Sequence, residues 1–263
     1  MVSDDLLLIE RDARGVFTLT LNDPARFNAL GSDMLQCLQN ALEDIEGDAS
    51  ARVVVLAANG KAFCAGHNLK DMAAHPQLDY YEQLFAQCSR MMQTITKLPV
   101  PVIARVQGMA TAAGCQLVAQ CDLAVASEQA SFATSGINYG LFCATPSVPL
   151  VRNVPFKQAM EMLLTGDFID AHTAQARGLI NRVVEAQALD VHVQQLVDAI
   201  LSKPAAAIRM GKALLYQQRE MGMEAAYELA GHTMACNMMD ADAQEGAQAF
   251  AQKRIPDWRR TTS

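Results

Sequence analysis

Hydrophobic residues follow two different periods along the first half of the chain, and these periods predict strands interleaved with helices. Residues 16–21 alternate between apolar and polar positions, which is the period of a strand with one buried face. Residues 53–57, 102–106 and 123–126 are short continuous apolar runs, as expected of strands that are buried on both faces. The first half of the chain is therefore expected to be an α/β fold around several buried strands.

Apolar residues at spacings of three and four predict helices between these strands. One such stripe covers residues 35–45, and Ser32 is expected to cap that helix. A second stripe covers residues 81–95 and lies between Pro76 and Pro99, either of which can bound a helix. The order of elements suits stacked ββα units better than a doubly wound sheet, although the spacing by itself leaves both arrangements open.

From about residue 157 onward the pattern becomes helical, with few strand candidates. Two short helices are expected to end at Gly166 and Gly178, because glycine readily adopts the left-handed conformation that closes a helix. Longer helical patterns cover residues 189–201, 204–219, 222–237 and 240–252. The last of these helices are rich in methionine, and such stripes are more typical of a core or an oligomer contact than of a cofactor site.

The net charge, the cysteines and the N-terminal residues limit the kinds of partner and the cellular location to be expected. The formal charge of −7 argues against nucleic acid and against an anionic membrane surface as general partners. The seven cysteines include no Cys-x-x-Cys pair, so we expect reduced thiols and neither disulfides nor zinc ligands. Residues 1–5 are acidic where a targeting peptide would be basic, and no apolar run approaches the roughly 20 residues that span a bilayer. These features predict a soluble cytoplasmic protein without a bound metal.

Two glycine-containing stretches are the candidate functional elements. Residues 62–70 (Ala-Phe-Cys-Ala-Gly-His-Asn-Leu-Lys) and residues 108–117 (Gly-Met-Ala-Thr-Ala-Ala-Gly-Cys-Gln-Leu) each follow a predicted buried strand. Small residues at such turns let a ligand approach bare backbone. Two turns of this kind can direct two N–H groups at one oxygen, which is what the stabilisation of a thioester enolate requires.

Together with residues 26–30 (Arg-Phe-Asn-Ala-Leu), these stretches resemble the crotonase (enoyl-CoA hydratase/isomerase) superfamily. Further matches, in the order and spacing of that family, lie at residues 131–132, 162–166, 178–180 and 245–254. The resemblance implies a spiral of ββα units with an acyl-CoA site in residues 1–200. It also implies a helical region in residues 201–263 that forms a trimer or a dimer of trimers. The CoA would enter as part of an acyl-CoA or enoyl-CoA substrate, without a separate cofactor.

The resemblance assigns the two N–H groups of an oxyanion hole to His67 and Ala113. Ala113 would then begin a helix whose dipole adds to the positive field around the bound oxygen. Binding of the CoA moiety is implied for a larger set of residues: Arg26, Ala29, Ala65, Gly66, Asn68, Leu69 and Lys70. For Arg26 and Lys70 the alternative is that they are solvated surface charges.

Both carboxylates that a hydratase of this family uses for proton transfer are missing. The corresponding positions hold Gln116 and Gly136. An amide can orient water but cannot take up a proton near neutral pH, and glycine can do neither. A positive φ at Gly136 would also strain any side chain restored there. The His67 side chain could move protons instead, or it could pack against a neighbouring loop, whereas Cys143 is expected in the core.

The sequence therefore leaves three functions to compare. The first is an enzyme of the hydratase/isomerase kind that stabilises a thioester enolate and uses non-standard residues for proton transfer. The second is a catalytically silent protein that binds acyl-CoA, which the missing carboxylates favour. The third is a structural oligomerisation module, for which the methionine-rich C-terminal part is the main support.

Overall fold

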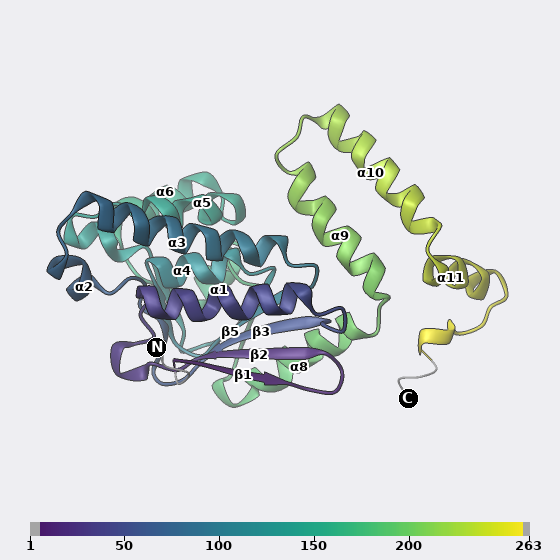
Figure 1. Cartoon of the computed structure of the whole chain (residues 1–263), viewed down its shortest axis with the longest axis horizontal. Helices are drawn as coiled ribbons and strands as arrows, with labels where there is room; N and C mark the ends of the chain where they lie inside the picture. The colour runs from purple at the N-terminus through teal and green to yellow at the C-terminus, as the bar shows by residue number, and fades with distance from the viewer. Residues whose placement is uncertain (1–5, 260–263) are drawn as a thin grey trace.

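The computed structural model describes residues 6–259 (Figure 1). The acidic segment 1–5 and residues 260–263, which are the ends of the two predicted regions, lie outside the described residues. One sheet has six strands in the order β1 (Leu7–Arg11), β2 (Val16–Leu21), β3 (Val53–Ala58), β5 (Val102–Val106), β7 (Leu123–Ser127) and β10 (Arg182–Val184). A second sheet has four strands in the order β4 (Ala62–Cys64), β6 (Met109–Thr111), β8 (Ser131–Ala133) and β9 (Ile169–Asp170).

The chain winds through the two sheets as a spiral. The pairs β3–β4, β5–β6 and β7–β8 each place their first strand in the large sheet and their second in the small one. Neighbouring turns pair in parallel, since Val55 lies beside Ile103 in one sheet and Ala62 lies beside Met109 in the other. The first two turns of the spiral are each followed by helices, so the predicted stack of ββα units is confirmed and the doubly wound alternative is wrong.

The continuous apolar runs are explained by helices on both faces of the large sheet. On one face, α1 (Ser32–Gly47) and α3 (Leu78–Lys97) lie side by side (Figure 1), and the core there includes Val54. On the other face, α8 (Leu189–Leu201) packs against Val53 and Val55. Successive residues of a strand point to opposite faces, so every residue of β3 must be apolar.

One capping prediction is wrong. Ser32 is the first residue of α1, and Gly31 occupies the N-cap position without a side-chain hydrogen bond. The helix closures behave as expected, since Gly166 and Gly178 have φ of 68° and 81°. The remaining helices between the strands are α2 (Leu69–Ala74), α4 (Ala113–Gln120), α5 (Ala144–Asn153), α6 (Phe156–Thr165) and α7 (Ala171–Ala176).

Three C-terminal helices stand apart from the two sheets. They are α9 (Ala205–Gln218), α10 (Met223–Met238) and α11 (Ala241–Ala251), and Figure 1 shows α9 and α10 as a hairpin that projects from the sheets. Large apolar side chains are exposed along these helices: Leu215, Met223, Tyr227, Met234, Met238 and Phe250. Such a surface agrees with an oligomer contact, which stays a prediction. Across residues 6–259, no helix combines the length and hydropathy needed to cross a membrane.

Candidate functional site

A cavity of about 840 Å³ brings most of the predicted site residues together. Its walls come from the segment before α1, the turn between β4 and α2, the turn between β6 and α4, and residues 135–146. Nine of the predicted residues line it: Arg26, Ala29, Ala65, His67, Asn68, Leu69, Lys70, Ala113 and Gly136. Two predicted residues, Gly66 and Gln116, are not part of its lining. Phe85 of α3 and Phe168 also line it, so the cavity is assembled from segments that lie far apart in the sequence.

Gly66 and Gly114 let the two predicted turns touch through their backbones. A Cβ at Gly114 would lie 2.0 Å from the carbonyl oxygen of Cys64, so only glycine fits there. Gly66 has a φ of 83°, and a Cβ on it would lie 2.9 Å from the amide nitrogen of Ala113. The glycines thus hold the turn carrying the His67 amide against the turn carrying the Ala113 amide.

Both candidate oxyanion amides are available to a ligand. Within residues 6–259, neither the His67 nor the Ala113 N–H donates a hydrogen bond to the protein. Ala113 is the first residue of α4, where amides have no partner inside the helix and the helix dipole adds positive potential. The N-cap residue Ala112 has a φ of 51°, a strained value for alanine, and its N–H donates to Ala133 O at 3.0 Å. The strained turn is therefore held in place from the neighbouring strand.

The imidazole of His67 packs beneath the cavity wall. Its Nδ1 lies 2.9 Å from Leu30 O, and since a carbonyl only accepts, Nδ1 carries the proton. The ring lies against Phe85, with centroids 5.4 Å apart. Burial lowers the pKa of His67, so the ring is neutral at pH 7. The Nε2 atom is buried and makes no hydrogen bond within the described chain. Packing against a neighbouring loop is thus present, and a role for this ring in proton transfer stays a prediction.

The two positions predicted to lack carboxylates differ in their surroundings. Gln116 lies on α4 and is 4% exposed, and among the described residues its Oε1 finds no hydrogen-bond donor. Gly136 lies in a 3₁₀ turn, Ser135–Tyr139, and is not among the glycines with positive φ, so that expectation is wrong. A Cβ at Gly136 would instead lie 2.6 Å from Leu141 O and 2.8 Å from Cys143 Sγ. Close packing, and not backbone conformation, therefore excludes a side chain at residue 136.

A hydroxyl pair that the sequence did not single out joins the two sides of the cavity. Thr111 Oγ1 and Ser135 Oγ are 2.6 Å apart, and both residues line the cavity. The bond ties the residue before Gly136 to the turn that carries Ala113. No motif marks this pair, because its members are 24 residues apart and are ordinary surface types in sequence.

The mouth of the cavity carries two cations. Arg26 and Lys70 are both exposed, and Arg26 lies 3.8 Å from the carboxylate of Asp23.

The segment before α1 is fixed by Asn28, which is fully buried with a φ of 54°. Its Nδ2 donates to the carbonyl oxygens of Asn59 and Ala62 at 2.8 and 2.9 Å. Asparagine tolerates this left-handed conformation, so it can hold the segment beside β4.

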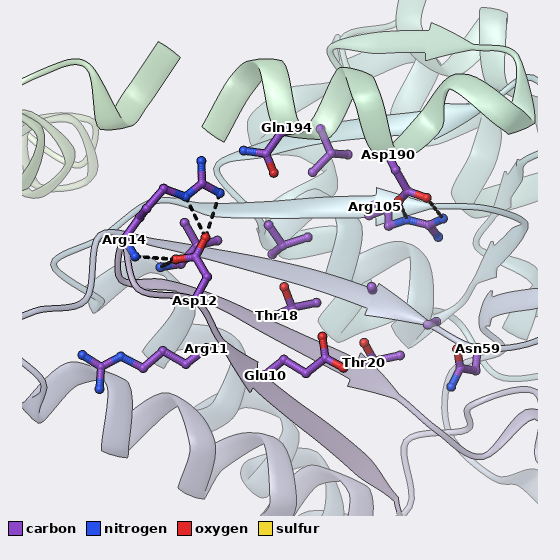
Figure 2. A pocket seen from close by; sticks show the side chains of 15 residues that line it. Glu10, Arg11, Asp12, Arg14, Thr18, Thr20, Asn59, Arg105, Asp190 and Gln194 are labelled. Carbon is purple, nitrogen blue, oxygen red and sulfur yellow. Dashed lines mark hydrogen bonds and ion pairs between the residues drawn. The ribbon is translucent and has the colours of Figure 1, made fainter. Parts of the chain in front are cut away.

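A second cavity of about 490 Å³ lies over β2 and β3, beside α8 (Figure 2). Four of its charged side chains form two ion pairs, Arg105 with Asp190 and Arg14 with Asp12. It contains none of the predicted site residues. A metal centre has no support either, since the described part of the chain has no cluster of three or more His, Cys, Asp or Glu side chains suited to an ion.

Comparison with known proteins gives the family. Residues 11–261 match the model of the enoyl-CoA hydratase/isomerase family. The chain is 42% identical over 252 residues to enoyl-CoA hydratase domain-containing protein 3, mitochondrial, of Xenopus laevis, which covers 96% of this chain and 86% of that protein. A crystal structure of enoyl-CoA hydratase from Mycobacterium smegmatis superposes with a TM-score of 0.95 at 59% identity, covering 96% and 98% of the two chains.

The crystal structure of human enoyl-CoA hydratase domain-containing protein 3 superposes with a TM-score of 0.92 at 41% identity, covering 96% of this chain and all of that one. These matches confirm the predicted crotonase-like fold. The chain belongs to the enoyl-CoA hydratase/isomerase (crotonase) family, and within it to the group that resembles enoyl-CoA hydratase domain-containing protein 3.

Proposed function

We propose that the chain binds acyl-CoA or enoyl-CoA thioesters in the larger cavity and stabilises the thioester enolate with the N–H groups of His67 and Ala113. The observation that carries the proposal is a pair of unpaired amides on two turns in backbone contact, both at the wall of one cavity. Two fixed donors aimed at one oxygen are what an enolate requires, and the loss of one such donor typically costs about 10²–10³ in rate.

Hydration by the usual route is expected to be weak. The Gln116 amide can orient a water molecule, but neither it nor Gly136 can move a proton. General acid and base groups each contribute about 10²–10⁴, so the loss of both removes most of the rate. The side chains at the cavity that can exchange a proton are His67, Lys70, Asp71, Tyr139 and Cys143. Turnover would therefore depend on one of these.

A catalytically silent acyl-CoA-binding protein is the second candidate. It is favoured because Gln116 and Gly136, the positions predicted for the two carboxylates, carry none, while the glycine-containing turns are present. The two candidates share the binding step and differ in turnover. Binding is thus the property to test first.

Thermal shift with butyryl-CoA, octanoyl-CoA and palmitoyl-CoA tests binding. Ligand at a hundred times its dissociation constant should stabilise the fold by about 2.7 kcal/mol. Lys70→Gln and Arg26→Gln should each weaken binding several-fold, because a phosphate contact at an exposed site is worth up to about 1 kcal/mol. Lys157→Gln, at an exposed site on α6, is the matched control. No shift with any chain length would refute the proposal.

Turnover is tested with crotonyl-CoA. Gln116→Glu restores one carboxylate with little change in shape and should give partial hydration, whereas the wild type should be slow. Gly136→Glu is unsuitable, because its Cβ would collide with the Leu141 carbonyl. A wild type with the full rate of a hydratase would show that another cavity residue moves the protons.

The proposal also covers the oligomeric state of the chain and its location in the cell. We propose a trimer or hexamer through α9–α11, supported by the exposed apolar side chains there, and sedimentation as a monomer at micromolar concentration would contradict it. A cytoplasmic location is kept as a proposal, although the Xenopus relative is named as mitochondrial. Fractionation of cells that express a tagged chain tests the location.

A further inference from the structure

The sulfur of Cys143 lies where a side chain at residue 136 would begin. A Cβ at Gly136 would be 2.8 Å from Cys143 Sγ, inside van der Waals contact. The thiol therefore occupies space that a side chain at position 136 would need. Cys143 is 5% exposed and lines the larger cavity, so the sulfur is packed but adjoins the cavity.

Hydrogen bonds join this region to the oxyanion turn. Thr111 Oγ1 and Ser135 Oγ are 2.6 Å apart, and Ala112 N–H donates to Ala133 O at 3.0 Å. The N–H of Leu141 donates to Gly136 O at 3.1 Å and closes the 3₁₀ turn, and Leu141 is two residues before Cys143. The thiol and the Ala113 amide therefore belong to two segments held together at one end of the cavity.

An unpartnered amide oxygen points to a ligand at the same end. Gln116 is 96% buried, and its Oε1 makes no hydrogen bond within residues 6–259. It is one turn after Ala113 on the same face of α4, and side chains on a helix lean toward the preceding turn. The side chain is thus directed toward the end of α4 that borders the cavity. A buried acceptor without a donor is costly, and since the enoyl group carries no N–H or O–H, a water molecule that enters with the ligand would satisfy it.

We propose that the Cys143 thiol adds to 2-enoyl-CoA thioesters and holds them as a covalent thioether. The inference rests on the proposed function, because the two backbone amides must first bind the thioester. It concerns a reaction that acyl-CoA binding does not itself require.

The addition balances without another reactant. A bond forms between sulfur and the β-carbon of the enoyl group, and the π electrons move to the thioester oxygen, where the N–H groups of His67 and Ala113 stabilise the enolate. The thiol proton ends on the α-carbon and the thioester is restored. Nothing is oxidised and nothing leaves, so the product has the mass of the chain plus one enoyl-CoA. A saturated acyl-CoA has no double bond and cannot react.

The surroundings of the thiol predict how the reaction depends on pH. Burial raises the pKa of Cys143, while the N–H of Gly136 opposes the shift. Cys143 is also the N-cap residue of α5, a position where the helix dipole favours a thiolate. The thiol is protonated at neutral pH, so adduct formation should accelerate as the pH rises from 7 to 9.

Intact-mass spectrometry after an acid quench, followed by peptide mapping, tests the inference with crotonyl-CoA and butyryl-CoA. The wild type should gain the mass of one crotonyl-CoA on Cys143 and nothing from butyryl-CoA. Cys143→Ser should form no adduct, and its melting temperature without ligand should stay near that of the wild type, which shows that the variant is folded. Cys236→Ser, which removes an exposed thiol on α10, should react like the wild type. Since the oxyanion hole stabilises the enolate that forms when a thiol in the cavity attacks, the adduct should form on Cys143 before it forms on the exposed Cys236.

The outcomes separate this inference from the proposed function. If butyryl-CoA stabilises the wild type but crotonyl-CoA leaves no adduct on Cys143, the inference is wrong and the proposed function stands. An adduct that persists in Cys143→Ser, or that maps to another cysteine, also overturns it. If no acyl-CoA produces a thermal shift, the proposed function itself is wrong.

Discussion

Replacing Lys212 by methionine should destabilise the fold, because this lysine fastens the C-terminal helices to the sheets. Lys212 lies on α9 and is 8% exposed. Its Nζ donates to the carbonyl oxygens of Ile95 and Val100 at 2.8 and 2.9 Å, and to Asp122 Oδ2 at 2.7 Å. All three donor positions of the ammonium group are therefore used.

The expected loss of folding stability follows from the Asp122 carboxylate, which would stay largely buried without its cation. Removing one partner of a buried ion pair typically costs about 3–5 kcal/mol. Asp122 would still accept from the N–H of Val102 at 2.7 Å and the hydroxyl of Tyr216 at 2.9 Å, and its side chain is 15% exposed. We therefore expect the lower end, about 3 kcal/mol. For a chain of this size, that corresponds to a melting temperature lower by about 6–12 °C.

Urea denaturation and thermal melting at one fixed protein concentration measure the loss. Lys157→Met, on the exposed side of α6, is the control and should stay within about 0.5 kcal/mol of the wild type. Adding Asp122→Asn to Lys212→Met should recover part of the loss, since the buried carboxylate is then neutral. If Lys212→Met loses less than about 1 kcal/mol, or no more than Lys157→Met, the ion pair does not fasten α9 as argued.

Two further substitutions test the glycine contact and a charge pair. Gly114→Ala should prevent normal folding, because its Cβ would lie 2.0 Å from Cys64 O, while Gly211→Ala in the open middle of α9 should be neutral or stabilising by up to about 1 kcal/mol. Circular dichroism and melting measure both, and a stable, normally melting Gly114→Ala would contradict the contact. The hydrogen bond from Arg105 (Figure 2) lowers the pKa of Asp190 below its ordinary value of 3.8. On acidification the unfolded chain takes up this proton first, so the contribution of the pair is complete above about pH 5 and is lost as the pH falls through the folded pKa. Urea midpoints between pH 6 and 3 should fall less steeply in Arg105→Gln than in the wild type, and equal slopes would refute the linkage.

The sequence predicted the elements well where one physical cause acts locally. The runs that became β3, β5 and β7 are apolar at every position because both faces of the large sheet are covered, and burial of that kind is visible in the order of residues. Helix α3 and the helices from residue 189 onward were evident from spacings of three and four, which reflect the 3.6-residue turn. The Ser32 cap was wrong because a capping side chain competes with the geometry of the chain that enters the helix, which the local sequence does not show.

The functional site also has one part that the sequence predicts and another that it does not. Its turns could be recognised from the sequence, because residues 62–70 and 108–117 carry glycine and small residues where backbone must be bare. The conformation of Gly136 and the position of the Cys143 sulfur could not. Both depend on how the loop through Leu141 folds back over the 3₁₀ turn, and no short motif encodes that return.

Secondary structure and turn chemistry were thus determined by the sequence itself, because backbone hydrogen bonds and the period of burial are set within a few residues. The tertiary structure alone decided which side chains share the cavity and which ones fasten the helices. Cys64 meets Gly114, and Lys212 meets Asp122 across 90 residues, through contacts that exist only after the spiral has closed. Such contacts depend on the mutual placement of several elements at once, so no single stretch of sequence contains them.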